Sequence, residues 1–356
     1  MSLPHAVGRF RFLRSAPARF AFAALAWLVL ISALHAWRNG ERSAGRVVRL
    51  GHMPVLSNLA CPILEEASKG SDLRYSAIKF SSFSEMGEAL RGGTIDAAFI
   101  IAPLPLVMRS QGVKVKIVSI GNRHESTLVA RKELGIGRGQ VRLLAGRTVA
   151  VPLRYSGHHV ALLRLLRRNQ MAQDAVRIVE MQPPDMAAAL RNGSLDAYFV
   201  GEPFAARSVR AGLATVVEYV EEDWPGFLCN VVAVREDWIR KEPEVVRALV
   251  AGIVRANLWA RDHRVEAATV ASKYWGHEVD LLRYAMDTPP GRMIFDRPVP
   301  AWADIRELYA ELVLAGLAAP SSTGVAADAT DESLASSAPT GGITDDIRSV
   351  LVQPGR

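Results

Sequence analysis

Residues 89–103 read ALRGGTIDAAFIIAP, and residues 189–203 read ALRNGSLDAYFVGEP. The two stretches align without a gap, and leucine, arginine, glycine, aspartate, alanine, phenylalanine and proline recur at equivalent positions. So many identities over so short a span indicate an internal repeat. The chain is therefore predicted to contain the same supersecondary unit twice.

Each copy of the repeat predicts a helix, a tight stop, a buried strand and a second helix. Gly93 and Gly193 stand where a left-handed residue commonly ends a helix. The runs 95–101 and 195–200 are short, apolar and bounded by turn residues, as central parallel strands are. The prolines that follow each run suit the first position of a new helix.

The two halves also begin alike. Apolar strands are predicted over 45–50 and 146–151, and loops lead from them into helices over 62–68 and 158–169. Strands alternating with helices predict two lobes, each a doubly wound α/β sheet with flanking helices. Ligands of such sheets bind beyond the carboxyl ends of the strands.

Further strands over 126–131 and 230–234 are predicted to carry the chain from the first lobe to the second and back. The first lobe then comprises residues 46–128 and 229–319, and the second comprises 129–228. The run 243–259 has apolar residues at helical spacing. Lobe closure is expected to be a hinge motion about segments near 127–131 and 226–231.

The two ends of the chain differ from the middle. Residues 1–45 are predicted to be a basic segment with a signal-anchor helix over 20–36. Residues 320–356 are rich in Ser, Thr, Ala, Gly and Asp, which cannot bury enough surface to fold alone. They are therefore predicted to be a disordered tail, with room for a short helix over 343–352.

The formal net charge of +7 is concentrated at the N-terminus, where residues 1–50 hold eight arginines and one glutamate. The rest of the chain is balanced, which argues against a nucleic-acid partner. Residues 20–36 carry no charge and follow four arginines, the pattern of a cleaved signal peptide or of an uncleaved membrane anchor. The absence of a clear cleavage site favours the anchor, and hence an extracytoplasmic protein on the inner membrane.

Cysteine usage and motifs give no sign of a metal, a cofactor or a catalytic centre. Cys61 and Cys229 are the two cysteines, and they could form one disulfide or remain two free buried thiols. The sequence has no G-x-S-x-G, H-E-x-x-H or G-x-x-x-x-G-K motif. We therefore expect a binding protein rather than an enzyme.

Three short motifs accompany the repeat: GHMP at 51–54, SGH at 156–158 and GEPF at 201–204. With the two lobes they resemble the solute-binding proteins of ABC transporters for nitrate, sulfonate, taurine and bicarbonate, over about residues 46–317. The same group includes thiamine-precursor binders. The resemblance implies a type II periplasmic-binding-protein fold, and a permease and an ATPase as partners.

The start of the helix predicted over 158–169 is the first candidate site. Free backbone N–H groups and the helix dipole favour an anion there, and an imidazole can donate to an oxyanion. We therefore expect ligand contacts from Ser156, Gly157, His158 and His159. The alternative is that Ser156 only caps the helix and that the histidines face solvent.

Loops after equivalent strands supply the remaining candidates. His52, Ser57 and Asn58 follow the first strand, and a surface loop without a ligand role is their alternative. Ala102-Pro103 and Glu202 follow the two repeat strands, so both should border the cleft. Glu202 would repel an anion, which favours a structural role for it as a partner of a helix dipole.

The ligand is expected to be a small oxyanion: a sulfonate, nitrate, bicarbonate or a small carboxylate. Two alternatives stay open at this point. The fold is also used by proteins that bind or make thiamine-pyrimidine precursors, and a tethered sensory module would have the same sequence features.

Overall fold

The computed structural model describes residues 16–40, 45–320 and 323–354. The chain forms two compact units, Met1–Arg46 and Val47–Arg356. The described part of the first unit contains one helix, α1 (Ala16–Gly40). In the described part of the chain, no helix is long and apolar enough to cross a membrane, so the membrane helix predicted over 20–36 is not supported. Its uncharged run lies at the short limit of the ~17–25 residues that span hydrocarbon.

The second unit contains two five-stranded sheets built to one plan. In the first sheet the order is β2 (Arg74–Lys79), β1 (Val47–His52), β3 (Ala97–Ile101), β10 (Asn230–Arg235) and β4 (Val115–Ile120). β1 pairs in parallel with both β2 and β3, and β10 is antiparallel to β3 and β4. The antiparallel strand reaches this sheet only after the chain has passed through the second sheet.

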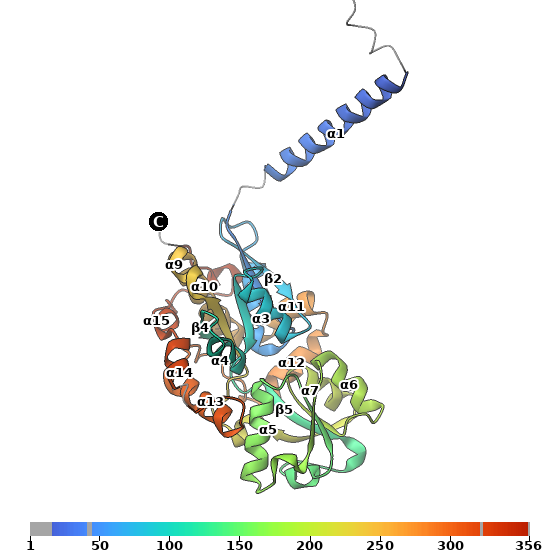
Figure 1. Cartoon of the computed structure of the whole chain (residues 1–356), viewed down its shortest axis with the longest axis vertical. Coiled ribbons are helices and arrows are strands. Elements are labelled where there is room, and N and C mark those ends of the chain that lie inside the picture. The colour runs from blue at the N-terminus through green and yellow to red at the C-terminus, as the bar shows by residue number, and fades with distance from the viewer. Residues whose placement is uncertain (1–15, 41–44, 321–322, 355–356) are drawn as a thin grey trace, which may run out of the picture. The chain divides into compact units, whose positions relative to one another are not determined.

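The second sheet repeats the arrangement. Its order is β7 (Arg177–Glu180), β6 (Thr148–Val151), β8 (Ala197–Gly201), β5 (Ser126–Arg131) and β9 (Ala214–Tyr219). β6 is parallel to β7 and β8, and β5 is antiparallel to β8 and β9. A two-sheet α/β fold with flanking helices was predicted from the repeat, and the structure confirms it (Figure 1).

The repeat itself forms α3 (Phe83–Arg91), β3 and α4 (Pro103–Ser110) in one copy, and α6 (Pro183–Arg191), β8 and α7 (Phe204–Arg210) in the other. The glycines that end α3 and α6 have φ of 75° and 80° at Gly93 and Gly193, the left-handed region that a bare Cα tolerates. The shared aspartates act alike: Asp96 accepts from the backbone N–H of Arg49, and Asp196 from that of Thr148. Each therefore fastens its repeat to the parallel strand beside it, β1 in the first sheet and β6 in the second.

Helices cover the outer faces of the sheets. Around the first sheet lie α2 (Ala60–Ala67), α9 (Glu236–Lys241), α10 (Pro243–Asp262), α11 (Arg264–Trp275) and α12 (Val279–Asp287). The second sheet is flanked by α5 (Gly157–Arg168) and α8 (Val220–Asp223). The aromatic side chains of Trp238, Trp259 and Trp275 are buried with the apolar face of α10 in one core.

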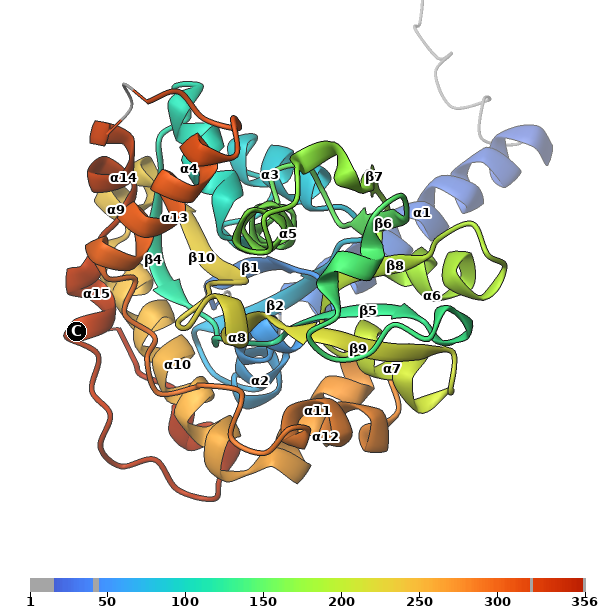
Figure 2. The ribbon, with the colours of Figure 1, turned by 90° about the horizontal axis from the view of Figure 1, so that it is seen from below.

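α13 (Trp302–Leu314) contacts α4 beside the first sheet and α5 beside the second, and the three helices are close together in Figure 2. Its Glu311 is buried and accepts from Arg164 Nη1 and Arg167 Nη2, each at 2.7 Å. At its other end Asp304 accepts from the buried Arg123 at 2.6 Å. α13 thus binds the two lobes together along one side.

The prediction of a disordered tail over 320–356 is wrong for the residues that the structure describes. They form α14 (Thr323–Ala329), α15 (Glu332–Ser336) and a 3₁₀ turn at Ile347–Val350. Four of its apolar residues, Ala326, Ala329, Ala335 and Val350, are buried, the last two in the core that contains α10. A segment too polar to fold alone can still be ordered by a surface that already exists.

Candidate functional site

The loops after β1 and β8 meet between the two sheets. The backbone N–H of Leu56 donates to the carbonyl of Glu202 at 2.8 Å, and that carbonyl belongs to the turn after β8. Asn122, in the crossover between β4 and β5, donates from Nδ2 to the carbonyl of Leu56 at 2.7 Å. The loops that were predicted to border a cleft are therefore in direct contact.

Glu125 lies at the centre of this contact and is completely buried. Ser57 Oγ donates to one carboxyl oxygen at 2.8 Å, and the backbone N–H of Glu202 donates to the other at 2.7 Å. Burial, reinforced by the nearby charge of Glu202, raises the pKa of Glu125 to about 8. Sequence reasoning missed Glu125, because a lone acid between two strands carries no pattern.

Glu202 is held by protein groups on both carboxyl oxygens. Thr127 Oγ1 donates to one at 2.7 Å, and the backbone N–H of Ala206 donates to the other at 2.8 Å. Arg292, which is also buried, approaches to 3.5 Å and donates to the carbonyl of Ser126 at 2.7 Å. Burial raises the pKa of Glu202 although the guanidinium opposes this shift. Both carboxyl oxygens of Glu202 are therefore paired within the protein, and its structural role stays a prediction.

His158 is a second buried centre. Its Nε2 lies 3.0 Å from Ser126 Oγ and 3.7 Å from the Cys229 thiol, and its ring meets those of Phe199 and Phe227. Burial lowers the pKa of His158 to about 3, so the imidazole is neutral near pH 7. Its Nδ1 has no hydrogen-bond partner among the described residues.

The other predicted contacts from the loop after β1 are also enclosed. Asn58 donates to the carbonyl of Met53 at 2.9 Å and accepts from Asn230 at 2.7 Å. His52 is buried beside Trp275, with a pKa lowered by burial to about 4. Both ring nitrogens of His52 lack a partner in the part of the chain that the structure describes.

The helix start at α5 is sealed as well. Ser156 caps the helix by accepting from the N–H of His159 at 3.1 Å. A Cβ on Gly157 would come within 2.9 Å of the Phe227 ring, so this N-terminus is covered by protein. Ala102 donates its N–H to the carbonyl of Cys229 at 2.9 Å, and Pro103 begins α4 in the same buried layer. Anion contact at Ser156, Gly157, Ala102 and Pro103 stays a prediction.

The two cysteines do not pair. Cys61 and Cys229 are both buried free thiols, the second of the two alternatives left open by the sequence. Burial raises the pKa of each thiol well above its ordinary value, which keeps both protonated near pH 7.

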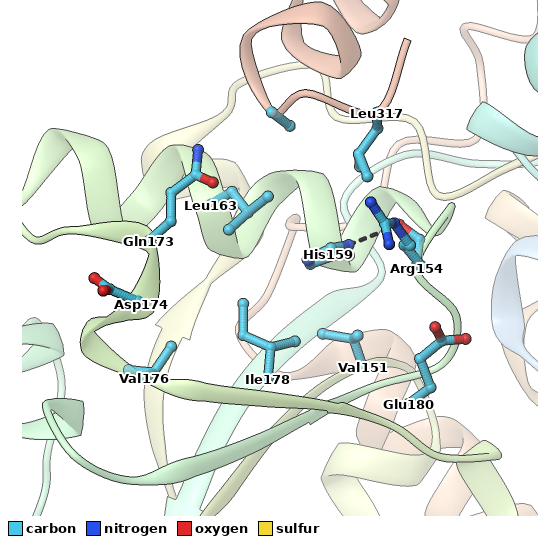
Figure 3. A pocket seen from close by; sticks show the side chains of 11 residues that line it. Val151, Arg154, His159, Leu163, Gln173, Asp174, Val176, Ile178, Glu180 and Leu317 are labelled. Carbon is cyan, nitrogen blue, oxygen red and sulfur yellow. Dashed lines mark hydrogen bonds between the residues drawn. The ribbon is translucent and has the colours of Figure 1, made fainter.

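The side chain of His159 lies apart from the buried cluster around His158. It borders a cavity of about 430 Å³ between the second lobe and the segment that follows α13, which Figure 3 shows in close-up. Its Nδ1 lies 2.7 Å from the carbonyl of Arg154. Arg154, Asp174 and Glu180 surround an apolar floor there, so the cavity carries charges of both signs. The side chains of His159 and His158 therefore lie in different surroundings.

A second cavity, of about 470 Å³, lies where the two lobes meet. It is lined by Pro54, Lys79, Phe80, Ser81, Pro184, Phe204, Arg207, Trp275, Gly276 and His277. The first four lie at or just after the ends of β1 and β2 in the first sheet, whereas Pro184, Phe204 and Arg207 come from α6 and α7 beside the second sheet. The cavity thus lies at the carboxyl ends of the strands, where the sheet rule places a ligand.

The charges around this inter-lobe cavity are all of one sign. Lys79 and Arg207 are cationic, and no carboxylate is among the lining residues that the structure describes. Arg207 Nη2 donates to His277 Nδ1 at 2.7 Å, and His277 Nε2 lies 3.2 Å from the carbonyl of Pro54. Burial lowers the pKa of His277 to about 4, so a neutral imidazole can accept from the guanidinium.

Sequence reasoning missed Lys79, Arg207 and His277 as site residues. Lys79 could have been found by applying the sheet rule to β2, since it is the last residue of that strand. His277 has no such signal, because it lies in a loop between two helices of the first lobe.

The sequence profile of the NMT1-like family matches residues 46–274, more than half of the chain. The chain belongs to the NMT1-like family. Among relatives of this NMT1-like chain, the taurine-binding periplasmic protein of Escherichia coli is 27% identical over 180 residues, which are 50% of this chain and 55% of that protein. The nitrate/nitrite binding protein NrtA of Synechococcus elongatus is 24% identical, over 63% of this chain and 57% of its own length.

Other relatives of the NMT1-like chain are longer. The nitrate import ATP-binding protein NrtC of Synechococcus elongatus is 25% identical over 62% of this chain, which spans only 36% of NrtC. Solved structures share the fold: a ligand-binding component of an ABC-type import system from Staphylococcus aureus has a TM-score of 0.75 at 18% identity, covering 83% of this chain and 100% of that one. Periplasmic NrtA from Synechocystis has a TM-score of 0.73 at 17% identity, covering 83% and 88%.

Proposed function

We propose that this NMT1-like chain is the extracytoplasmic solute-binding component of an ABC importer and captures a small organic oxyanion between its lobes. The observation that carries the proposal is the inter-lobe cavity, which presents Lys79 and Arg207 and is lined by no described carboxylate. Cations without a facing carboxylate in a concave site favour an anionic ligand. The names of the taurine-binding and nitrate-binding relatives support the same class of ligand.

The guanidinium of Arg207 is oriented by the protein and keeps N–H groups that can bind an oxyanion. Its bond to the neutral His277 fixes one edge of the guanidinium without neutralising its charge. The remaining N–H groups can donate in pairs to a sulfonate or carboxylate, a geometry that lysine cannot provide. Lys79, from the other lobe, would add a point charge, so a bound anion would be held from both sides.

The size and walls of the cavity favour a ligand with an organic body. A water molecule takes about 30 Å³ of liquid, so an ion the size of nitrate or bicarbonate would fill a small part of about 470 Å³. Phe80, Phe204 and Trp275 supply apolar walls that such an ion could not use. An organic sulfonate or carboxylate would place its charged group on Arg207 and its body against the rings.

The buried residues that the sequence singled out take a different role in this proposal. Ser57, Asn58, His158 and Glu202 bond to protein groups, and we assign them to the contact that closes the lobes. Pro54 joins the two regions, because it lines the cavity and begins the loop that carries Ser57. The solute would therefore bind at the edge of this contact.

Delivery to a permease and an ATPase is part of the proposal, as is a position outside the cytoplasm. Delivery is supported by relatives named as components of import systems, and the position by a relative named as periplasmic. Tethering through the arginine-flanked segment near the N-terminus remains a sequence-based prediction. The lobe boundaries 46–128 with 229–319, and 129–228, also remain predictions, as does the hinge between them.

A thermal-shift panel with the full chain tests the binding function. The anions are nitrate, bicarbonate, taurine, methanesulfonate, benzenesulfonate and benzoate, each with sodium chloride as the ionic-strength control. An anion present at 100 times its Kd should stabilise the protein by about 2.7 kcal/mol. We expect stabilisation by an organic sulfonate or carboxylate that exceeds the effect of nitrate.

Variants locate the binding. Arg207→Gln is expected to abolish most of the stabilisation, whereas Arg191→Gln, an exposed arginine on α6, should leave it unchanged. If no anion in the panel stabilises the protein, the proposed binding function is contradicted. Stabilisation that survives Arg207→Gln would place the anion elsewhere in the chain.

A further inference from the structure

One buried side chain, Glu125, lies in the contact between the two lobes. This residue ends the crossover between β4 and β5, and its two carboxyl oxygens face different lobes. Ser57, in the loop after β1, donates to one oxygen at 2.8 Å. The backbone N–H of Glu202, in the turn after β8, donates to the other at 2.7 Å. An oxyanion held between two lobes would receive donors of these same kinds.

Two glycines make room for the arrangement. A Cβ on Gly201 would lie 2.7 Å from Glu125 Oε1, so a larger residue would displace the carboxylate. A Cβ on Gly121 would lie 1.8 Å from the carbonyl oxygen of Ser57, so the loop after β1 could not come this close to the crossover. The backbone on both sides is thus shaped to bring Ser57 and Glu202 onto Glu125.

We propose that the Glu125 carboxyl group acts as an internal ligand, a latch that holds the loop after β1 and the turn after β8 together in the closed arrangement. Opening the lobes breaks the bond from Ser57 and the backbone bond from Leu56 to Glu202. Glu125 is then a positioning residue, because closure also sets Pro54 and Phe204 on the two sides of the inter-lobe cavity.

The surroundings of Glu125 make the latch sensitive to pH. The titratable groups near it are Glu202, Cys229 and His158, and the Arg292 guanidinium lies beyond Glu202. Cys229 and His158 are neutral near pH 7, so the charge of Glu202 is the main one that Glu125 meets.

The direction of the pH effect follows from the two protonation states. Glu125 ionises with a pKa of about 8 in the closed form, against an ordinary 4.5 in water. The closed form therefore binds the extra proton between these values, and closure weakens as the pH rises through this window. Between pH 5.5 and 8.5 the ratio of open to closed molecules should rise on the order of 100-fold.

The latch is tested by measuring the distance between lobes in the full chain. Spin labels are placed at Arg91→Cys and Arg191→Cys, the exposed equivalent positions at the ends of α3 and α6, and distances are measured by double electron–electron resonance. The native thiols are buried, and a chain without the added cysteines controls for their labelling. Measurements are made at pH 5.5 and 8.5 with no solute added.

Wild type is expected to show one short distance at pH 5.5 and an additional longer one at pH 8.5. Glu125→Gln mimics the protonated acid and should keep the short distance at both values, whereas Glu125→Ala and Ser57→Ala should populate the longer one at both. Glu133→Gln, an exposed glutamate, should behave as wild type. Equal distributions in wild type and both alanine variants would overturn the latch, as would a full pH response in Glu125→Gln.

The link from the latch to solute capture rests on the proposed function, but the distance measurement does not. If the distances fail to respond, the effect of Arg207→Gln on anion binding is still decisive for the solute site. If no anion binds, the distances still report whether Glu125 holds the lobes together.

Discussion

Replacing Arg292 by methionine should be among the most damaging single changes in the second unit. The guanidinium is buried and donates to the carbonyl of Ser126, to Thr127 Oγ1 at 2.9 Å and to Glu221 Oε1 at 3.0 Å. It also lies over the Tyr219 ring, 4.4 Å from its centroid. Methionine fills much of the same volume but leaves the buried Glu202 carboxylate without its cation.

The cost follows from that unpaired charge. Removing one partner of a buried ion pair typically costs about 3–5 kcal/mol, and the lost bond to a buried carbonyl adds to it. Without Arg292 the pKa of Glu202 should rise further, because the guanidinium now opposes the effect of burial. The loss in stability should therefore be smaller at pH 5, where Glu202 can take up a proton, than at pH 8.

Urea unfolding followed by circular dichroism at both pH values measures this loss. Arg297→Met, an exposed arginine of the same segment, is the matched control and should change the free energy of unfolding by no more than about 0.5 kcal/mol. The double variant with Glu202→Gln should cost less than the sum of the two single changes. Equal losses for Arg292→Met and Arg297→Met, or strictly additive double-variant energies, would refute the assigned role of the buried pair.

Three further outcomes are expected. Gly201→Ala should destabilise the fold by about 1–3 kcal/mol, because its Cβ would lie 2.7 Å from a buried carboxylate oxygen, whereas Gly137→Ala, whose nearest contact would be 3.7 Å away, should be nearly neutral in the same urea titration. The pKa of His277 is lowered to about 4, so the stability that its neutral form contributes is present above about pH 6.5 and is lost as the pH falls toward 4. The urea midpoint of His277→Gln should therefore fall less between pH 7 and pH 4 than that of the wild type. Deleting the chain after residue 319 should lower the melting temperature, because Arg255 loses its hydrogen bonds to the carbonyls of three tail residues. In an Arg255→Met variant the same deletion should lower the melting temperature by less.

Much of the fold could be predicted because the same helix–strand–helix pattern occurs twice in the sequence. The strand predicted over 126–131 matches β5, and those predicted over 95–101 and 195–200 contain β3 and most of β8. Short apolar runs between a helix-ending glycine and a proline leave few other conformations. Asp96 and Asp196 recur for a shared reason, since each accepts from the backbone of the neighbouring parallel strand, β1 or β6.

The candidate site was harder to predict because its side chains come from distant segments. Arg292 donates to the carbonyl of a residue 166 positions away, and no local pattern marks it. The inter-lobe cavity draws Lys79 from a strand end and His277 from a helix–helix loop. Such juxtapositions depend on how the lobes pack, which the periodicity of a single segment does not encode.

The ordered tail was missed for a related reason. Composition measures whether a segment can build its own core, and residues 320–356 cannot. Arg255 nevertheless donates to the carbonyls of Pro339, Gly341 and Ser349, so the tail is held by a buried cation of α10. Contacts between a polar segment and another element are invisible to composition.

Isothermal titration calorimetry of the full chain with benzenesulfonate, beside methanesulfonate and nitrate, measures the affinity of the inter-lobe cavity for an organic oxyanion. We expect benzenesulfonate to bind more tightly than either small anion, and Arg207→Gln to weaken its binding by about tenfold or more, equivalent to about 1.4 kcal/mol. The same Arg191→Gln control should leave the affinity unchanged. Tighter binding of nitrate than of benzenesulfonate, or an affinity indifferent to Arg207, would contradict an organic oxyanion site between the lobes.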